Sequence, residues 1–363
     1  MKRRSQSILW LLITLLTAGG LTTRAVVFNV TYDTSVTSLT NALQVENAFN
    51  TATAYLQSLY TNNINIAITV YWGATGPFSS GIGLGASSTS YIGTTTYAQL
   101  TNYLRNARST SEASNAVASL PASDPTGGNT WWYPRAEAKA LGYIANDTSQ
   151  DGSIGFASTV SYTFDPTNRL VSGKFDFIGV ALHEITEVMG RVYYDLSTIF
   201  IPYDLYRFSG PGTRVINTTA PSVYFSVDNG TNVLRFFNPV EANGDLTDWA
   251  VSGPADSFDY SVSAGKKTLL SYADLVSLNV LGYKLSYSRP ILKLTTLAVT
   301  NRVVSYTSTP GSTFTILATS NLALPMASWT NLGTNTDTAS PGQFFFTNAA
   351  STNLLRYYRA RLN

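Results

Sequence analysis

The sequence predicts an α+β protein with a large mixed domain followed by a small all-β domain. A strand, a helix and a strand follow one another between residues 26 and 71, and a strongly apolar helical stretch occupies Phe175–Arg191. Beyond residue 290 the apolar residues alternate with a period of two, and no helical period appears. The chain of 363 residues is long enough for two cores. We therefore expect domains at 26–286 and 290–363, separated near Ser286–Pro290.

Residues 1–25 are predicted to be an export signal. The basic residues Lys2–Arg4 precede an apolar run at Ile8–Leu16, and Thr23–Ala25 offers a cleavage site for a signal peptidase. This segment contains four of the 23 basic residues and none of the 21 acidic ones, which leaves 19 basic residues and a net charge of −2 after its removal. The remaining chain therefore has no basic surface for nucleic acid, and none of its apolar runs is long enough for an integral membrane span. We expect a secreted protein, extracellular or at the cell surface.

The composition suits a secreted protein that is rich in strands. Only 12% of the residues are charged, while serine, threonine, asparagine, glycine and tyrosine are abundant. Because the sequence has no cysteine, stability depends on buried apolar area and not on disulfides. We expect a monomer.

The elements of the first half of the large domain follow from periodicity and from turn residues. Apolar alternation predicts strands, and apolar residues at helical spacing predict helices. In order, the expected elements are a strand at Val26–Tyr32, a helix at Val45–Tyr60, a strand at Ile64–Trp72, a loop or hairpin at Gly73–Gly93, helices near Tyr97–Ala107 and Ser111–Leu120, a helical turn at Ala136–Leu141 and a strand pair within Ser153–Phe164.

The second half of the large domain contains two further predicted helices. The first, within Phe175–Arg191, ends at Gly190, because glycine accepts the left-handed conformation that commonly follows a helix. A loop-rich segment with many aspartates runs from Tyr193 to Tyr260, and Ser271–Tyr283 is an amphipathic helix. In the small domain we expect a sandwich of about seven strands. The clearest of these strands are Leu292–Thr300, Thr313–Leu317, Phe344–Thr347 and Leu354–Ala360.

His183 is the only histidine of the chain, and since there is no cysteine, any transition-metal site has to include it. It begins the string His-Glu-x-x-Glu, which contains Glu184 and Glu187. Positions i and i+4 of a helix project about 40° apart, so His183 and Glu187 face the same side and can hold one cation. Glu184 is rotated by about 100° from His183, where it can act as a general base toward a water molecule at the cation.

A simpler interpretation of the same string needs no ion. His183 and Glu187 then form an ordinary hydrogen-bonded pair one helical turn apart, and Glu184 is solvated or paired to Arg191. The apolar residues on the same helix make the burial of so many polar groups costly unless something compensates. The string alone leaves both interpretations open.

Several strings of the chain together resemble a known family. HEITEVMGR is followed by DLYRFSGPGTR, VYFSVDNGT, GDLTDWA and ADSFDY. These strings resemble a bacterial family of secreted, zincin-like metallopeptidases, and the order of GSIGFAS, the helix and DLVSLNVLGY resembles the wider metzincin group of zinc endopeptidases. The resemblance covers about residues 26–285. It implies a zincin-like, metzincin-like domain in which a twisted mixed sheet lies over the active-site helix, with a polypeptide substrate bound along an edge strand that includes Ile154, Gly155 and Phe156.

The chain departs from the metzincin pattern at its ligand positions. That pattern has histidines where this chain has Glu187 and Tyr193, and no methionine lies between Met189 and Met326, so the Met-turn is missing. Tyr193 or Asp195 is therefore expected to complete the ligand set. With a single imidazole the site prefers Zn²⁺ less strongly and also admits Mn²⁺, Fe²⁺ or Ca²⁺.

The leading hypothesis is a secreted, metal-dependent endopeptidase-like hydrolase in which Glu184 activates water. The alternative is a catalytically inactive protein on the same scaffold that binds a surface or matrix. A third hypothesis is a glycan-binding protein that uses Trp131, Trp132 and Trp249. The C-terminal module resembles the β modules of exported proteins from Verrucomicrobia-type bacteria, which suggests attachment, sorting or a spacer.

Two acidic segments are secondary candidates for cation binding. Asp147–Ser158 begins like a calcium loop, with oxygens at positions 1, 3 and 5 and glycine at position 6, but position 12 is a serine. A polar turn is the other interpretation of this segment. Asp245–Asp259 is expected to line the cleft or to bind a structural cation, or else to be a solvated loop with Trp249 and Phe258 packed beneath it.

Overall fold

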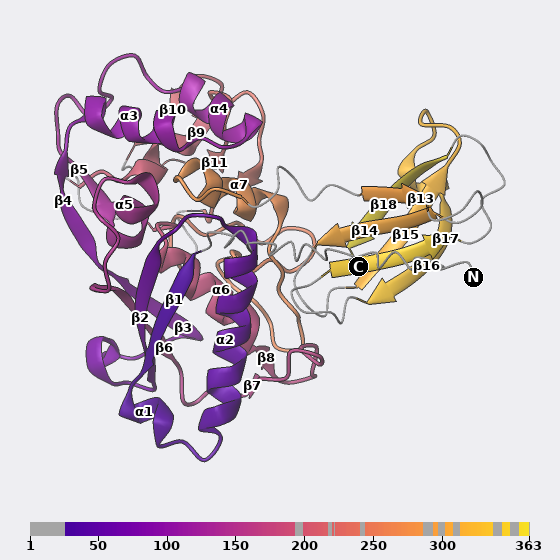
Figure 1. Cartoon of the computed structure of the whole chain (residues 1–363), viewed down its shortest axis with the longest axis horizontal. Coiled ribbons are helices and arrows are strands. Elements are labelled where there is room, and N and C mark those ends of the chain that lie inside the picture. The colour runs from indigo at the N-terminus through magenta and orange to yellow at the C-terminus, as the bar shows by residue number, and fades with distance from the viewer. Residues whose placement is uncertain are drawn as a thin grey trace, which may run out of the picture.

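The computed structural model of the protein is a mixed α+β structure, as the sequence predicts (Figure 1). It describes residues 26–192, 199–216, 220, 222–239 and 244–285, and in the C-terminal part residues 293–296, 302–307, 313–336, 343–348 and 356–362. The predicted export signal at 1–25 lies outside the described residues.

A four-stranded mixed sheet forms the framework of the large domain. Its strand order is β1 (Val27–Tyr32), β2 (Asn65–Trp72), β6 (Gln150–Phe156) and β3 (Gly85–Thr89). The first three strands are parallel, and β3 pairs antiparallel to β6 at the edge. The predicted succession of strand, helix and strand over residues 26–71 is confirmed.

Two helices, α2 (Ala42–Leu59) and α6 (Phe177–Val188), pack side by side against this sheet (Figure 1). Helix α2 is amphipathic, because Val45, Phe49 and Leu56 recur at helical spacing and all three are buried. Helix α6 contacts both β3 and β6, so its position relative to the edge strand is fixed by packing. Gly190, just after α6, has a φ of +128°, which confirms the predicted use of glycine there.

The two predicted short helices are confirmed as α3 (Tyr97–Ala107) and α4 (Ser111–Ala118). Each begins at a threonine whose hydroxyl accepts a hydrogen bond from the first turn, Thr96 for α3 and Thr110 for α4. The remaining elements of the large domain are α1 (Thr34–Thr37), a 3₁₀ turn at Gly76–Phe78, β4 (Tyr91–Thr95), β5 (Trp131–Pro134), α5 (Arg135–Leu141), β7 (Tyr162–Thr163), β8 (Phe175–Asp176), a 3₁₀ turn at Pro202–Tyr206, β9 (Arg207–Gly210), β10 (Thr213–Arg214), β11 (Tyr224–Phe225), β12 (Arg235–Phe236) and α7 (Tyr272–Val280).

The prediction of a strand pair within Ser153–Phe164 is wrong. Strand β6 lies between β2 and β3, and β7 instead pairs in parallel with β8. The antiparallel partner of β6 is β3, inside the glycine- and serine-rich stretch that was expected to be a loop or hairpin. The sequence of β3, GASST, has no large apolar residue, so hydrophobic alternation could not reveal it.

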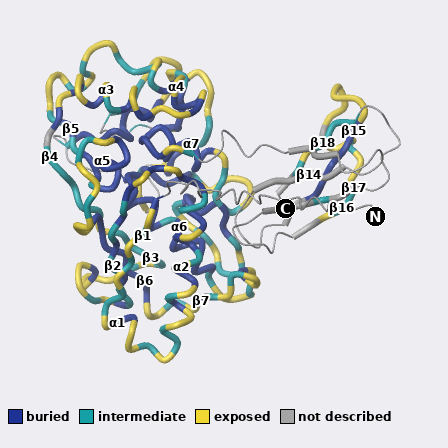
Figure 2. The backbone as a smooth tube through the Cα atoms, in the orientation of Figure 1, coloured by how far each residue is buried: buried dark blue, intermediate teal, exposed yellow. Residues whose placement is uncertain are grey.

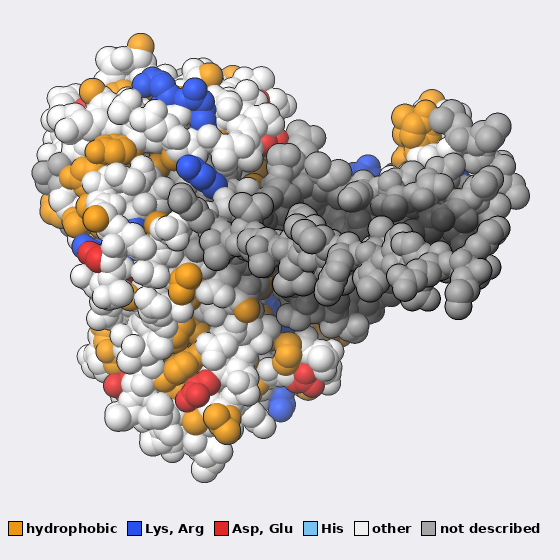
Figure 3. All heavy atoms as spheres, in the orientation of Figure 1, with side chains coloured by type: hydrophobic (Ala, Val, Ile, Leu, Met, Phe, Trp, Pro, Cys, Tyr) orange, Lys and Arg blue, Asp and Glu red, His pale blue; other side chains and the backbone are white. Residues whose placement is uncertain are grey.

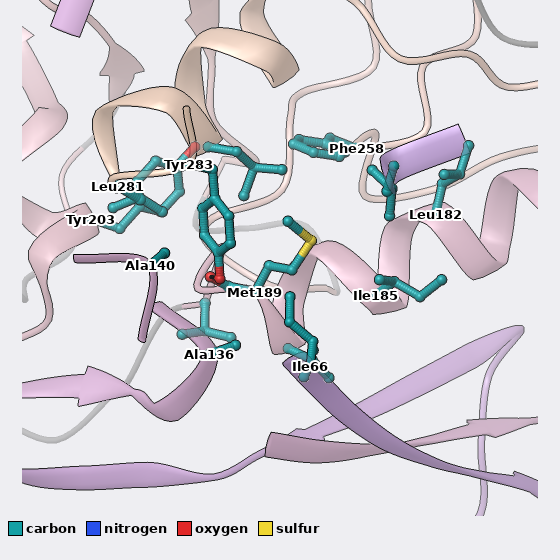
Figure 4. Close-up of a cluster of buried hydrophobic side chains, with 14 of the residues drawn as sticks. Ile66, Ala136, Ala140, Leu182, Ile185, Met189, Tyr203, Phe258, Leu281 and Tyr283 are labelled. Atoms are coloured by element: carbon teal, nitrogen blue, oxygen red, sulfur yellow. Dashed lines mark hydrogen bonds between the residues drawn. The ribbon is translucent and has the colours of Figure 1, made fainter. Parts of the chain in front are cut away.

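The core is centred where α6 meets the sheet and the segments that follow it. Figure 4 shows Met189 between Ile66 of β2 on one side and Phe258 on the other, with Leu182 and Ile185 farther along the same helix. All five side chains are almost completely buried, and each contributes roughly 1.5–3 kcal/mol of burial free energy. Figure 2 shows the same concentration of buried residues between the sheet, α2 and α6.

The two ends of the large domain are joined to each other. Tyr60, after α2, forms an isolated antiparallel bridge with Leu285. The side chain of Asn62 donates to the carbonyl of Gly282 (2.9 Å), and its amide oxygen accepts from the backbone N–H of Lys284 (2.6 Å). The last described residues of this domain are therefore fixed beside its first helical unit.

The C-terminal part consists of two three-stranded antiparallel sheets (Figure 1). Phe346 of the first sheet lies 3.4 Å from the position of a Cβ on Gly333 of the second, so the sheets contact each other. The order in the first sheet is β13 (Lys293–Thr296), β14 (Arg302–Thr307) and β17 (Gln343–Asn348), and in the second it is β16 (Thr330–Thr336), β15 (Thr313–Thr319) and β18 (Tyr357–Leu362), with a 3₁₀ turn at Met326–Ser328.

The surface carries few charges. On the face shown in Figure 3, uncharged atoms predominate, and basic and acidic side chains are scattered among them. This agrees with a charged fraction of only 12%. Within the part of the chain that the structure describes, no helix combines the length and apolar character needed to cross a bilayer.

Candidate metal centre

The N-terminal end of α6 is fixed by a buried ion pair. Arg169 donates to both carboxylate oxygens of Asp176 (2.9 and 2.6 Å), and the backbone N–H of Thr268 donates to the same carboxylate (3.0 Å). Gly179, one turn into the helix, allows this close approach, because a Cβ there would lie 1.7 Å from the hydroxyl oxygen of Thr268. The helix and the segment around residues 257–268 are thereby held together.

His183 is oriented by that segment. Its Nδ1 lies 2.8 Å from the main-chain carbonyl oxygen of Ser257. Since a carbonyl oxygen only accepts, Nδ1 carries the hydrogen, and Nε2 is directed toward two carboxylates. A histidine held in this way through Nδ1 is the usual arrangement for ligation through Nε2.

Glu187 and Asp248 are those two carboxylates. The Nε2 atom of His183 lies 3.2 Å from Oε1 of Glu187 and 3.4 Å from Oδ1 of Asp248. One donor atom from each of the three residues lies within 4.8 Å of the others, so the group can hold a metal ion. Ser87 of β3 donates to the second oxygen of Glu187 (2.8 Å), which fixes the rotation of this carboxylate.

The spacing of these donor atoms is compatible with a bound metal ion as well as with hydrogen-bonded ion pairs. Donors about 2.1 Å from a tetrahedral zinc ion are separated by about 3.4 Å from each other. Charged hydrogen bonds between nitrogen and carboxylate are shorter, about 2.7–2.9 Å. The distances of 3.2 and 3.4 Å around His183 are therefore close to the edges of a ligand tetrahedron.

Arg191 lies behind the two carboxylates. It donates to Glu187 Oε1 (3.3 Å) and to Asp248 Oδ1, and its side chain is completely buried. The guanidinium packs over the ring of Phe258, 4.3 Å from the centroid. The predicted alternative had paired Arg191 with Glu184; the structure pairs it with Glu187 and Asp248 instead.

The charges of this cluster shift the protonation of its members. Burial alone would lower the pKa of His183, but the negative charges of Asp248 and Glu187 outweigh it and raise the pKa to about 10. Burial would raise the pKa of Glu187, but His183 and Arg191 lower it to about 2. Glu187 is therefore ionised and ready to act as an anionic ligand.

Glu184 lies next to the ligands and lines the same pocket. It is 5% exposed, and burial, followed by the negative charge of Glu187, raises its pKa well above the usual value. Its carboxylate occupies the space beside Gly85 of β3, where a Cβ would lie 2.4 Å from Oε1. This position and the raised pKa suit a general base.

His183, Glu184, Glu187 and Asp248 line a pocket of about 490 Å³. One wall is formed by residues 83–87, which include the start of β3, and the opposite wall by residues 256–262. Strand β3 has β6 as its one partner among the described strands, so its outer edge is the open edge of the sheet. An extended chain can pair with such an edge.

The predicted substrate-binding residues Ile154, Gly155 and Phe156 are not at this edge. They belong to β6, which is paired on both sides, and Ile154 and Phe156 are completely buried. Gly155 faces Phe78 and Ile82, not the pocket. The expectation that these residues lie on an edge strand was wrong, because the edge strand β3 itself was missed.

The other predicted ligands, Tyr193 and Asp195, lie outside the described residues. The candidate ligand that sequence reasoning missed is Asp248. Its signal was present in the string GDLTDWA and in the acidic segment Asp245–Asp259, which was expected to line the cleft. Trp249, the next residue, is fully buried against Phe237 and Phe258, and this packing fixes the backbone at Asp248.

The secondary candidates have other partners. Lys139 donates to Asp151 (2.7 Å), and Arg135 pairs with Asp147, so the carboxylates of the predicted calcium segment already bind cationic side chains, and most of the segment is strand β6. Trp131 and Trp249 are fully buried and cannot stack on a sugar from solvent. Comparison of the chain with family models, with curated proteins and with solved structures finds no match.

Proposed function

We propose that the protein is a secreted, metal-dependent hydrolase of the endopeptidase type. The observation that supports this best is the convergence of His183, Glu187 and Asp248 at the spacing of metal ligands on the wall of a pocket. Glu184 stands beside them, where a general base is needed. The proposal includes a metzincin-like scaffold, and an antiparallel edge strand beside the helix of His183 is consistent with it.

Zinc is the ion that we propose first. One imidazole and two carboxylates are suitable zinc ligands, although this set also accepts Mn²⁺, Fe²⁺ or Ca²⁺. Tyr193 and Asp195 stay candidates for a further ligand. A bound divalent cation would supply Lewis acidity, which polarises a carbonyl group and acidifies a water molecule.

The residues of the chain supply the remaining chemistry. Glu184 takes the proton from the attacking water and passes it to the leaving amine, and its raised pKa makes it a stronger base than an exposed glutamate. The hydrogen bond from His183 Nδ1 to Ser257 keeps Nε2 directed at the site. The edge of β3 holds an extended polypeptide across the pocket, which replaces β6 as the proposed substrate-binding strand.

Metal content and a Glu184→Gln variant test this proposal. The purified protein should contain one zinc ion per chain. After dialysis against a chelator, it should take up one zinc ion per chain again. Glu184→Gln should keep that stoichiometry and lose peptide hydrolysis on a casein-like substrate. A variant that hydrolyses as fast as the unchanged protein removes Glu184 from the mechanism.

One observation favours a second candidate, a non-catalytic protein on the same scaffold. With His183 protonated, His183 and Arg191 balance the charges of Glu187 and Asp248, so the cluster is satisfied as a network of ion pairs. Such a protein binds a surface or matrix through other parts of the molecule. The absence of stoichiometric metal together with the absence of hydrolysis in the presence of added zinc or manganese decides for this candidate.

A further inference from the structure

Arg191 makes an unusual number of contacts with the candidate ligands. Its Nη2 donates to Glu187 Oε1 (3.3 Å) and to the main-chain oxygen of His183 (3.2 Å), and its Nη1 donates to Asp248 Oδ1. Its Nε donates to the hydroxyl of Thr186 (3.3 Å). Four hydrogen bonds and the ring of Phe258 therefore leave the guanidinium a single position.

The two carboxylate oxygens that contact Arg191 are the same atoms that face His183. Oε1 of Glu187 and Oδ1 of Asp248 each lie between Nε2 of His183 and the guanidinium. The three ligand residues line the pocket, whereas Arg191 does not. An ion that enters from the pocket therefore contacts the carboxylates on their pocket side. The positive charge of Arg191 lies on their other side.

A positive charge in this place has opposite effects on the empty and the occupied site. In the empty site it stabilises two buried carboxylates that would otherwise repel each other. In the occupied site it repels the divalent cation across the same oxygens. Both effects lower the affinity for the cation, and the first also keeps the protein folded while the site is empty.

We propose that Arg191 substitutes for the ion in the empty site, so that the protein folds without metal and binds its cation reversibly. This inference rests on the proposed function, since it assumes that His183, Glu187 and Asp248 bind a divalent cation. It concerns a residue that acts through Glu187 and Asp248 without contacting the substrate. Its expected signature is an increase in metal affinity when the charge is removed, which loss of a merely structural contact does not produce.

The test compares Arg191→Met with the unchanged protein in zinc titrations by calorimetry and in thermal unfolding with and without a chelator. Arg191→Met should bind zinc about tenfold more tightly or better, because two anionic ligands lose a cationic partner at hydrogen-bonding distance. Its chelated form should lose far more thermal stability than its zinc form. In the unchanged protein the two forms should differ less.

Arg207→Met is the matched control. Arg207 is also a buried arginine and pairs with Asp204 (3.7 Å), and it is not among the residues that line the pocket. Its substitution should lower the stability of the chelated and zinc forms equally and leave the zinc affinity unchanged.

The outcomes separate this inference from the proposed function. If the unchanged protein binds no divalent cation, the proposed function fails and the inference fails with it. If the unchanged protein binds zinc and Arg191→Met binds it equally or more weakly, the inference alone is wrong. Should Arg191→Met not fold even with zinc, Arg191→Gln serves in its place, because it is neutral yet still donates hydrogen bonds, and the same increase in affinity is expected.

Discussion

Asp248 and His183 come from distant parts of the chain, and the structure places Oδ1 of one 3.4 Å from Nε2 of the other. Helix α6 presents His183, and a loop anchored by the buried side chain of Trp249 presents Asp248. Asp248 adds a third candidate ligand to the two that the helical His-Glu-x-x-Glu string provides.

Asp248→Asn should lower zinc affinity by about a hundredfold, because a neutral amide is a much weaker ligand than a carboxylate and leaves Arg191 without one of its anionic partners. Calorimetric titration measures the change. Asp228→Asn is the control, since Asp228 lies in a separate turn where it is bonded to Ser226 and Asn232. Equal affinities in the Asp248 variant and the unchanged protein would remove Asp248 from the ligand set.

Gly85→Ala should slow hydrolysis by about tenfold or more and leave metal content intact. The added methyl group would lie 2.4 Å from Oε1 of Glu184, so the carboxylate has to move away from the position of a general base. Gly83→Ala is a close control, because Gly83 lines the same pocket and a Cβ there meets nothing within 4 Å. Steady-state kinetics on a peptide substrate compares the two, and an equal effect in both variants contradicts the prediction.

Glu137→Met should stabilise the protein at neutral pH. Glu137 on α5 is completely buried, and neither carboxylate oxygen has a hydrogen-bond partner among the described residues. Leaving such a group unsatisfied costs on the order of 1–3 kcal/mol, which the apolar side chain avoids. Chemical denaturation at pH 7 measures the gain, and Glu46→Met, at a partly exposed position of α2, should give none.

The same variant should change how stability depends on pH. Burial raises the pKa of Glu137 well above 4.5, so the folded protein binds a proton that the unfolded chain releases above that pH. Stability from this group is fully present below about pH 4.5 and is lost as the pH rises toward the folded pKa. Denaturation curves between pH 4 and 8 should therefore show a smaller loss for Glu137→Met than for the unchanged protein; parallel curves refute the assignment.

Asp151→Asn should destabilise the protein by about 3–5 kcal/mol, because it leaves the buried ammonium of Lys139 without its closest anionic partner. Millimolar calcium should leave the unfolding temperature of the unchanged protein unaltered if Asp147 and Asp151 serve only Arg135 and Lys139. Thermal unfolding with calcium and with a chelator tests this. If calcium raises the unfolding temperature of the unchanged protein but not that of Asp151→Asn, the segment Asp147–Ser158 is a calcium-binding loop after all.

Local periodicity predicted those parts of the fold whose structure is decided locally. Helices α2, α3 and α4 lie close to where their apolar spacing predicts them, and threonine caps fix the starts of α3 and α4. Strand β3 was not predicted because it is short, half-exposed and made of small residues. Its pairing with β6 depends on tertiary contacts and not on a local pattern. That single omission also misplaced the proposed substrate-binding strand.

In the candidate site, too, only the residues whose arrangement is decided locally could be predicted from the sequence. The helix places His183 and Glu187 on one face, since i and i+4 positions are neighbours by geometry alone, and turns Glu184 about 100° away from His183. The position of Asp248, which is also the second anionic partner of Arg191, depends on how a long loop returns to the helix. No residue spacing along the chain encodes this. Tyr193 and Asp195 stay predictions, because they lie outside the described residues.

The bridge between Tyr60 and Leu285 brings the end of the large domain next to its first strand-helix unit. Val26 donates to the carbonyl of the same Tyr60, so Val26 and Leu285 lie at neighbouring points of the domain. A short linker can join these points, and the chain can then be reopened at the exposed turn around Gly127–Asn129. Such a circular permutant would carry its new ends away from the original attachment point while leaving the ladder of β1, β2, β6 and β3 uncut.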